Sequence, residues 1–367
     1  MKDKVAVIGA GTAGLILAKN TAEAGIDTVV YDQKNELGIP VRASGILSIR
    51  GLNNLGIDYS RGVTNTLFGA RIHGGSRTMS IVAKKPMARV LDRKILNDIC
   101  EELALKAGAT VQKGVRVNDA MLDKLAKERI IVGADGAVSS VARHYNMGAV
   151  SNYITTYKAD FNVDVKDTGI VDLFFDQKLA PGLFAWLCPN AKDILEVGIG
   201  LDSRFGNAKR AFDKFLGMEE VVDLLENSKK IDEGASIIPI GLRKKIVDER
   251  REVLLVGDAA GQIKHTTGGG IIFGSNAAII AARTIKSHLK KGTKLSLYDK
   301  AFKMQFKRDM LLHAMIHNLY SSMSAERIGT LIGMLHSLGV DRFLGDYGDM
   351  DRPSLVIKRF FLRGLAD

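Results

Sequence analysis

The chain has 367 residues, of which 46% are apolar and 25% charged, which is the composition of an ordinary folded protein and excludes a disordered one. Its length favours two lobes over a single small core, and no stretch approaches the roughly 20 apolar residues that span a bilayer. The formal net charge is +11, and the two cysteines, Cys100 and Cys188, argue against a disulfide framework and for a reducing, cytoplasmic setting.

The first elements carry a nucleotide-binding pattern. Residues 3–9 predict a buried strand and residues 12–24 a helix, so we expect no signal peptide before them. The turn between them contains Gly9, Gly11 and Gly14 in the spacing G-x-G-x-x-G. Strand, glycine turn and helix in this order are typical of a dinucleotide-binding βαβ unit.

Two residues of this unit have specific predicted roles. Gly11 lets the start of the helix approach a pyrophosphate, and free N–H groups at the helix N-terminus attract its negative charge. A second strand over 27–32 ends at Asp32, whose carboxylate is placed to accept hydrogen bonds from a ribose.

Further along the chain, other segments carry similar strand-end signals. Residues 92–106, which open with Asp92-Arg93, predict an amphipathic helix. Buried strands break at Asp135-Gly136 and at Gly257-Asp258, and Thr267-Gly268-Gly269-Gly270 opens another helix. Gly257-Asp258 follows a strand's carboxyl end, which is where doubly wound sheets bind ligands.

Together with the glycine pattern, these segments resemble the flavoprotein hydroxylase superfamily. The resemblance implies that the cofactor is FAD and that its domain is discontinuous, with a substrate lobe inserted. We expect the FAD contacts to come from Gly9, Gly11, Ala13, Gly14, Asp32, Arg42, Ala43, Ser44, Gly45, Arg93, Val117, Asp258, Gly269, Gly270 and Ile271.

The remaining segments complete a mixed α/β fold. Residues 66–90 and 153–201 contain alternating runs that predict antiparallel strands of one substrate-lobe sheet. Residues 207–227 have a helical pattern, and residues 295–367 are mostly helical. We therefore predict a Rossmann-like FAD-binding domain, an inserted antiparallel-sheet substrate lobe and a helical C-terminal region. Their expected bounds are 1–65 with 91–150 and 241–292, then 66–90 with 151–240, then 293–367.

One segment narrows the function. Residues 180–190 hold Trp186, which is the only tryptophan in the chain, between two prolines. Phe184 and Trp186 point to the same face of an extended segment, and Pro189 stiffens its end. This pattern suits a rigid wall for an apolar ligand, and it equally suits an ordinary lobe core.

With the segments after 37 and 257, this stretch resembles the geranylgeranyl reductase family over about residues 3–290. The resemblance implies that reduced FAD delivers a hydride from N5 to an isoprenoid double bond of a lipid, as in the making of archaeal membrane lipids. It also implies that Phe184, Trp186 and Pro189 contact the substrate.

The chain departs from the family pattern at several positions. Ala43-Ser44-Gly45 stands where the family has Cys-Gly-Glu-Gly, so the catalytic residues are not identified from the motif. His265 is a weak candidate for the proton donor, and a solvent-facing loop histidine is the alternative. His313 and His317 lack a third ligand, so we expect no metal site.

Other functions and partners remain open at this stage. A flavin monooxygenase acting on an apolar or aromatic substrate is the alternative enzyme. The electron donor can be a ferredoxin, which would suit the positive charge, or a reduced nicotinamide. The basic and apolar residues 354–365 are compatible with peripheral contact with an anionic membrane, and no pattern indicates nucleic-acid binding.

Overall fold

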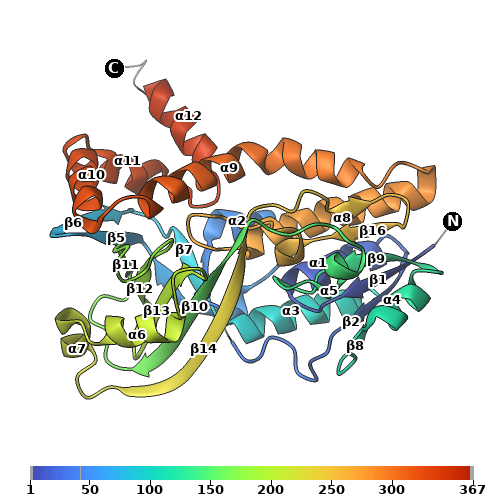
Figure 1. Ribbon diagram of the computed structural model, residues 1–367, viewed down its shortest axis with the longest axis horizontal. Coiled ribbons are helices and arrows are strands. Elements are labelled where there is room, and N and C mark those ends of the chain that lie inside the picture. Colours follow the sequence, from blue (N-terminus) through green and yellow to red (C-terminus); the bar gives the residue numbers. More distant parts are fainter. Residues whose placement is uncertain (1–2, 42, 364–367) are drawn as a thin grey trace.

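The computed structural model describes residues 3–41 and 43–363 (Figure 1). A six-stranded sheet carries the dinucleotide pattern, with strand order β15-β16-β9-β1-β2-β8. All its neighbouring strands are parallel except β15 and β16. The strands are β1 (Lys4–Ile8), β2 (Asp27–Tyr31), β8 (Thr110–Gln112), β9 (Arg129–Gly133), β15 (Val247–Asp248) and β16 (Val253–Leu255).

Helices cover this sheet and bury its apolar strands. α1 (Thr12–Ala22) packs against both α3 (Arg93–Lys106) and α8 (Ile271–Lys291). The strands β1, β9 and β16 are almost entirely buried, as expected for parallel strands covered on both faces. Shorter elements complete the layer: α4 (Asp119–Leu125), α5 (Ser140–His144) and the 3-10 turn η2 (Gly257–Ala260).

A second sheet has seven strands in the order β14-β10-β13-β12-β11-β5-β6. Its outer face is covered by α6 (Ala208–Leu216) and α7 (Glu219–Leu224), at the lower left of Figure 1. The strands are β5 (Gly69–Gly74), β6 (Arg77–Val82), β10 (Asn152–Asn162), β11 (Ile170–Phe174), β12 (Ala185–Ala191), β13 (Ile194–Asp202) and β14 (Lys229–Ile240).

The expected antiparallel pairing holds for five of the six strand pairs of this sheet, and the structure differs from the expectation of one sheet in two respects. First, β5 and β11 pair in parallel, because the long stretch between them supplies the crossover that a parallel pair needs. Second, β4 (Val63–Leu67) and β7 (Ala88–Leu91) pair with β3 (Ile46–Ser48) in a separate three-stranded sheet. Alternating apolar and polar residues indicate a strand, but they do not say which sheet it joins.

The short helical elements near this small sheet are α2 (Ile49–Asn54) and the 3-10 turn η1 (Ser60–Gly62). The helical character predicted for residues 207–227 is confirmed, and the chain forms two helices there, α6 and α7, with a break at Gly217. Gly217 ends α6 because glycine has the lowest propensity, apart from proline, for a helix interior.

The C-terminal region is helical, as predicted. It comprises α9 (Leu297–Ser321), α10 (Ala325–Ser337), α11 (Val340–Tyr347) and α12 (Pro353–Arg363). Figure 1 shows α9 along the upper edge of the molecule and α12 standing out from it. None of the helices in the described part of the chain is long and apolar enough to cross a membrane.

Candidate FAD and substrate site

The three fingerprint glycines have different environments. Gly9 has φ +106°, and a Cβ there would collide with the Ala134 carbonyl, while a Cβ on Gly14 would collide with the Gly9 carbonyl. A Cβ on Gly11, in contrast, would have no described protein atom within 4 Å. Gly9 and Gly14 therefore serve the turn and the helix contact, and Gly11 leaves open backbone where a pyrophosphate can approach.

Asp32 supports the same loop. Its two carboxylate oxygens accept hydrogen bonds from the Ala10 N–H at 2.8 Å and the Lys34 N–H at 2.9 Å. A carboxylate has about four lone-pair sites, so these bonds leave capacity for a ribose hydroxyl.

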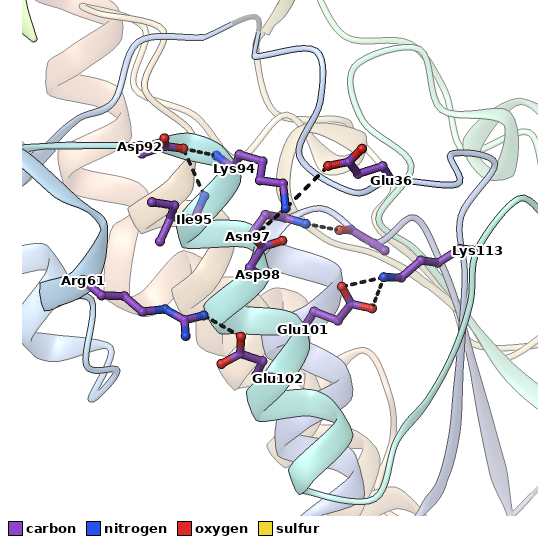
Figure 2. A network of polar contacts seen from close by, with 11 residues as sticks. Glu36, Arg61, Asp92, Lys94, Ile95, Asn97, Asp98, Glu101, Glu102 and Lys113 are labelled. Carbon is purple, nitrogen blue, oxygen red and sulfur yellow. Dashed lines mark hydrogen bonds and ion pairs between the residues drawn. The ribbon is translucent and has the colours of Figure 1, made fainter.

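Helix α3 is tied to this loop by a residue that the sequence reasoning missed. The Asn97 side chain is buried and donates to the Ala10 carbonyl at 3.1 Å. Figure 2 shows Asp92 accepting from the backbone N–H groups of Lys94 and Ile95 at the start of the helix. Asp92 and Asn97 thus hold the first turns of α3 against the glycine loop, which sets the position of Arg93.

Arg93 and Asp258 form the charged part of the site. Burial lowers the pKa of Arg93, opposed chiefly by the charge of Asp258, and burial raises the pKa of Asp258, opposed by Arg93. Arg93 Nε and Ser44 Oγ are buried polar atoms without a hydrogen-bond partner among the described residues. Such orphaned atoms fit a polar ligand that completes their bonding.

The segments around Gly257 converge on the same place. A Cβ on Gly270 would lie 2.6 Å from Asp258 Oδ1, and one on Gly274 would lie 2.9 Å from the Gly257 Cα. A Cβ on Gly257 would lie 3.1 Å from the Ala13 Cβ. The start of α1, the start of α8 and the Asp258 turn therefore pack so closely that a side chain at these glycines would collide with its neighbours. Here the residues present fit FAD, whose length requires contacts from remote segments.

The remaining expected FAD contacts lie close to these elements. Gly45 is held against β7 by the Leu91 N–H at 3.0 Å, and Ala43 precedes it as an exposed residue. Val117 is buried after the loop that bonds to Asp32, and Ile271 and Gly269 flank Gly270 at the start of α8. Arg42 lies outside the described residues.

Asp135 has a structural task. Its carboxylate accepts bonds from Ser139, Ser140 and Val141 at the start of α5. The Asp135 carboxylate therefore supports the N-terminus of a short helix in this chain.

The predicted aromatic wall lies on the inner face of the seven-stranded sheet. Phe184 and Trp186 are buried, with ring centroids 6.2 Å apart. Phe175 packs on Phe184 at 5.1 Å and on Tyr320 of α9 at 5.0 Å. The Pro189 carbonyl accepts a bond from Asn65 of β4 at 2.6 Å, which joins the small sheet to this wall.

A buried polar cluster that the sequence reasoning missed borders this wall. Glu196 is 1% exposed and accepts from Trp186 Nε1 at 2.8 Å and from Lys158 Nζ at 2.8 Å. Burial raises the pKa of Asp160, on the same face, to about 6. Ile263 belongs to the same core cluster as Phe184 and Trp186, and a Cβ on Gly270 would lie 2.9 Å from it, so the wall borders the FAD contacts.

His265 is half-buried, and its Nε2 accepts a hydrogen bond from the Gly241 N–H at 3.1 Å. Burial and the neighbouring His317 lower the pKa of His265 to about 4. The imidazole is therefore neutral at pH 7, which makes it a poor proton donor.

A second buried ion pair ties the C-terminal region to the site. Lys264 Nζ lies 2.7 Å from Asp351 Oδ1, and the other oxygen of Asp351 accepts from the Ser48 hydroxyl. Lys264 also lies beside the backbone of Gly269. In the described part of the chain, no three His, Cys, Asp or Glu side chains are grouped to hold a metal.

Comparisons with known proteins agree with this geometry. Residues 2–301 match the FAD binding domain family. The chain is 31% identical to digeranylgeranylglycerophospholipid reductase 1 of Methanothermobacter thermautotrophicus, over 78% of each chain. It is 28% identical to an uncharacterised protein of Methanocaldococcus jannaschii, over 96% of this chain and 94% of that one.

A solved structure has the same fold. It is a geranylgeranyl bacteriochlorophyll reductase-like protein from Thermoplasma acidophilum, with a TM-score of 0.80 and 24% identity over 90% of both chains. The mixed α/β fold and the FAD cofactor predicted from the sequence are thereby confirmed. The chain is an FAD-dependent oxidoreductase, and it belongs to the digeranylgeranylglycerophospholipid reductase family.

Proposed function

We propose that the protein saturates carbon–carbon double bonds in the isoprenoid chains of lipids, with the hydride coming from N5 of reduced FAD. Two observations support this proposal: relatives named digeranylgeranylglycerophospholipid reductase, and the buried wall of Phe184 and Trp186, which packs through Ile263 beside Gly270 of the expected FAD site. Among the structural features of this chain, the aromatic wall of Phe184 and Trp186 is the one on which the proposal rests.

The residues that would hold FAD have separate tasks. The backbone at Gly11 and the start of α1 would hold the pyrophosphate. Arg93 Nε and Ser44 Oγ, both without described partners, would find theirs on the cofactor. When bound and reduced, FAD supplies a hydride to one alkene carbon, and a proton must reach the other.

The chain's own residues would then hold the alkene in place and exclude water from it. An unactivated alkene offers no polar group to hold, so the site must fix it by shape and keep water away. Phe175, Phe184, Trp186 and Tyr320 supply flat apolar surfaces for this purpose. Because Phe184 and Trp186 are only 6% and 9% exposed, an isoprenoid chain enters when these side chains repack.

The expected partners follow the same reasoning. We propose an isoprenoid lipid as the substrate, a ferredoxin or a reduced nicotinamide as the electron donor, and peripheral contact with an anionic membrane. The net charge of +11 supports an acidic donor and an anionic surface.

A direct experiment uses the purified holoprotein. It is reduced with dithionite without oxygen and incubated with a geranylgeranyl lipid, and the product is examined by mass spectrometry. We expect a mass gain of H₂ for each bond reduced, with no gain when dithionite is left out. An unchanged lipid would contradict the proposal. Insertion of an oxygen atom under air with a reduced nicotinamide would favour the monooxygenase.

A further inference from the structure

The C-terminal helices expose an unusual amount of apolar surface. Eleven of the 21 large apolar side chains that are exposed in the described residues lie on α9–α12. Scattered exposed apolar residues are normal, but grouped ones mark an interaction site. The grouping on α9–α12 therefore indicates that another molecule covers this surface.

Four of the six large apolar residues that are exposed on α9 follow one side of the helix. They are Met304, Leu311, Met315 and Leu319, with exposed fractions of 87%, 54%, 65% and 48%. Spacings of seven and four residues place them along one stripe. The opposite side of α9 is buried against the body of the protein, so the helix is apolar on two sides and only one side is covered.

Helix α12 carries further exposed apolar side chains. Its base is fixed to α9, since Asp309 accepts from the Ser354 N–H at 2.9 Å and pairs with Arg352 at 2.7 Å. Near its end, Phe360 and Phe361 are 47% and 67% exposed. Figure 1 shows α12 rising from the same upper edge along which α9 runs. We call Met304, Leu311, Met315, Leu319, Phe360 and Phe361 the apolar face.

Positive charges accompany the apolar face. Lys307 and Arg308 are exposed within the α9 stripe, and Lys358 and Arg359 directly precede the two phenylalanines. Apolar side chains beside lysine and arginine match the boundary between lipid headgroups and acyl chains. Each cation near an anionic leaflet adds to the attraction.

The same charges argue against a second copy of the chain as the partner. A two-fold dimer through this face would place equivalent patches against each other. Lys307 and Arg308 of the two copies would then repel each other, because the stripe has no acidic residue to neutralise them. An anionic bilayer satisfies both the apolar and the basic residues.

We infer that the apolar face docks the protein on the surface of an anionic lipid bilayer. The choice of a bilayer over other anionic partners rests on the proposed lipid substrate. Docking by this face places α9, which contributes Tyr320 to the aromatic wall, between the bilayer and the site.

The test measures co-sedimentation of the holoprotein with phosphatidylglycerol vesicles and with phosphatidylcholine vesicles. We compare Met315→Glu/Leu319→Glu and Phe360→Ser/Phe361→Ser with the control Val222→Glu/Leu224→Glu, which changes exposed residues of α7 on the substrate lobe. Removing two apolar side chains that the bilayer would bury weakens vesicle binding at least ~10-fold. We expect that loss for both face variants, no change for the control, and weaker binding at high salt.

Several results would overturn the inference. The wild-type protein would remain in the supernatant with phosphatidylglycerol, or all three variants would lose binding equally. A dimer that Met315→Glu/Leu319→Glu dissociates in ultracentrifugation would assign the face to a second copy. Reduction of a detergent-solubilised geranylgeranyl lipid is measured separately, so a protein that binds vesicles without reducing the lipid would contradict only the proposed function.

Discussion

The indole N–H of Trp186 donates a hydrogen bond of 2.8 Å to Glu196, across Gly198 on the neighbouring strand. Gly198 is paired with Trp186, and a Cβ there would overlap the indole ring. The glycine therefore lets the ring lie across β13 and reach the carboxylate. Lys158 binds the same carboxylate, so a buried ion pair fixes the orientation of the apolar wall.

The first prediction concerns this pair. Glu196→Ala leaves the buried Lys158 with only its longer ion pair to Asp160 at 3.4 Å, and we expect a loss of about 1–3 kcal/mol in the free energy of unfolding. Trp186 is the only tryptophan, so its fluorescence reports this site alone. Glu196→Gln keeps an acceptor for the indole and should preserve the emission better than Ala. Emission and urea unfolding identical to wild type in the Ala variant would refute the role of Glu196.

The cofactor loop gives a second prediction. Gly11 has φ −73° and open space around its Cβ position, so Gly11→Ala should fold with a stability change within about 0.5 kcal/mol. The new methyl group would occupy the space of the pyrophosphate, and we expect FAD binding at least ~10-fold weaker. Gly217→Ala, at φ −83° in the substrate lobe, is the matched control. Equal flavin content in both variants would remove Gly11 from the FAD site.

Arg93 carries a third prediction. Its Nε has no partner among the described side chains and backbone groups, and a bond to a charged group contributes about 1.5–3 kcal/mol. Arg93→Met should therefore weaken FAD binding ~10- to 100-fold. Arg61→Met is the control. It removes an exposed arginine that Figure 2 shows bound to Glu102 of α3, the helix that also carries Arg93, and this variant should retain FAD. Titration of the apoproteins with FAD distinguishes the two.

The pH dependence of stability tests the burial of His265. Its pKa falls from 6.5 to about 4 on folding, so the unfolded chain binds the extra proton first as the pH drops. The stabilisation is complete above about pH 6.5 and is lost toward pH 4, up to about 3 kcal/mol. His265→Gln should flatten this part of the curve, while the exposed His336→Gln should not. Parallel curves for wild type and His265→Gln would show that the imidazole titrates normally.

The buried ion pair of Lys264 and Asp351 provides a fifth prediction. Lys264→Met strands the carboxylate of Asp351 and should cost about 3–5 kcal/mol of unfolding free energy. Lys264→Met/Asp351→Asn should cost less than the sum of the two single changes, because neither charge remains unpaired. Lys303→Met, in an exposed pair with Asp299, should cost about 1 kcal/mol or less. Additive single and double variants would show that the two residues act independently.

The local parts of the FAD site could be read from the chain because they are local in space. Gly9, Gly11 and Gly14 act within one turn, and their backbone angles and Cβ distances depend on residues next to them or on the adjacent strand. The cap by Asp92 is equally local, since its carboxylate binds N–H groups two and three residues away. Such short-range chemistry follows from residue type and spacing alone.

Other parts of the site depend on pairing between distant segments. Glu196 contacts Lys158 because β10 and β13 are neighbours in one register. Lys264 reaches Asp351 across 87 positions of the chain. The strands β4 and β7 show the same limit, because their pattern fits either of two sheets.

The amino-acid sequence by itself determined the nucleotide-binding unit and the aromatic segment around Trp186, because each depends on spacing within a short stretch, and the family resemblance of several such segments added the FAD cofactor. Only the tertiary structure decided that β5 and β11 run parallel, that His265 is half-buried and neutral at pH 7, and that Glu196 holds the indole. The physical reason is that burial, pKa and strand partners depend on which remote segments pack together, and a local pattern carries no information about those neighbours.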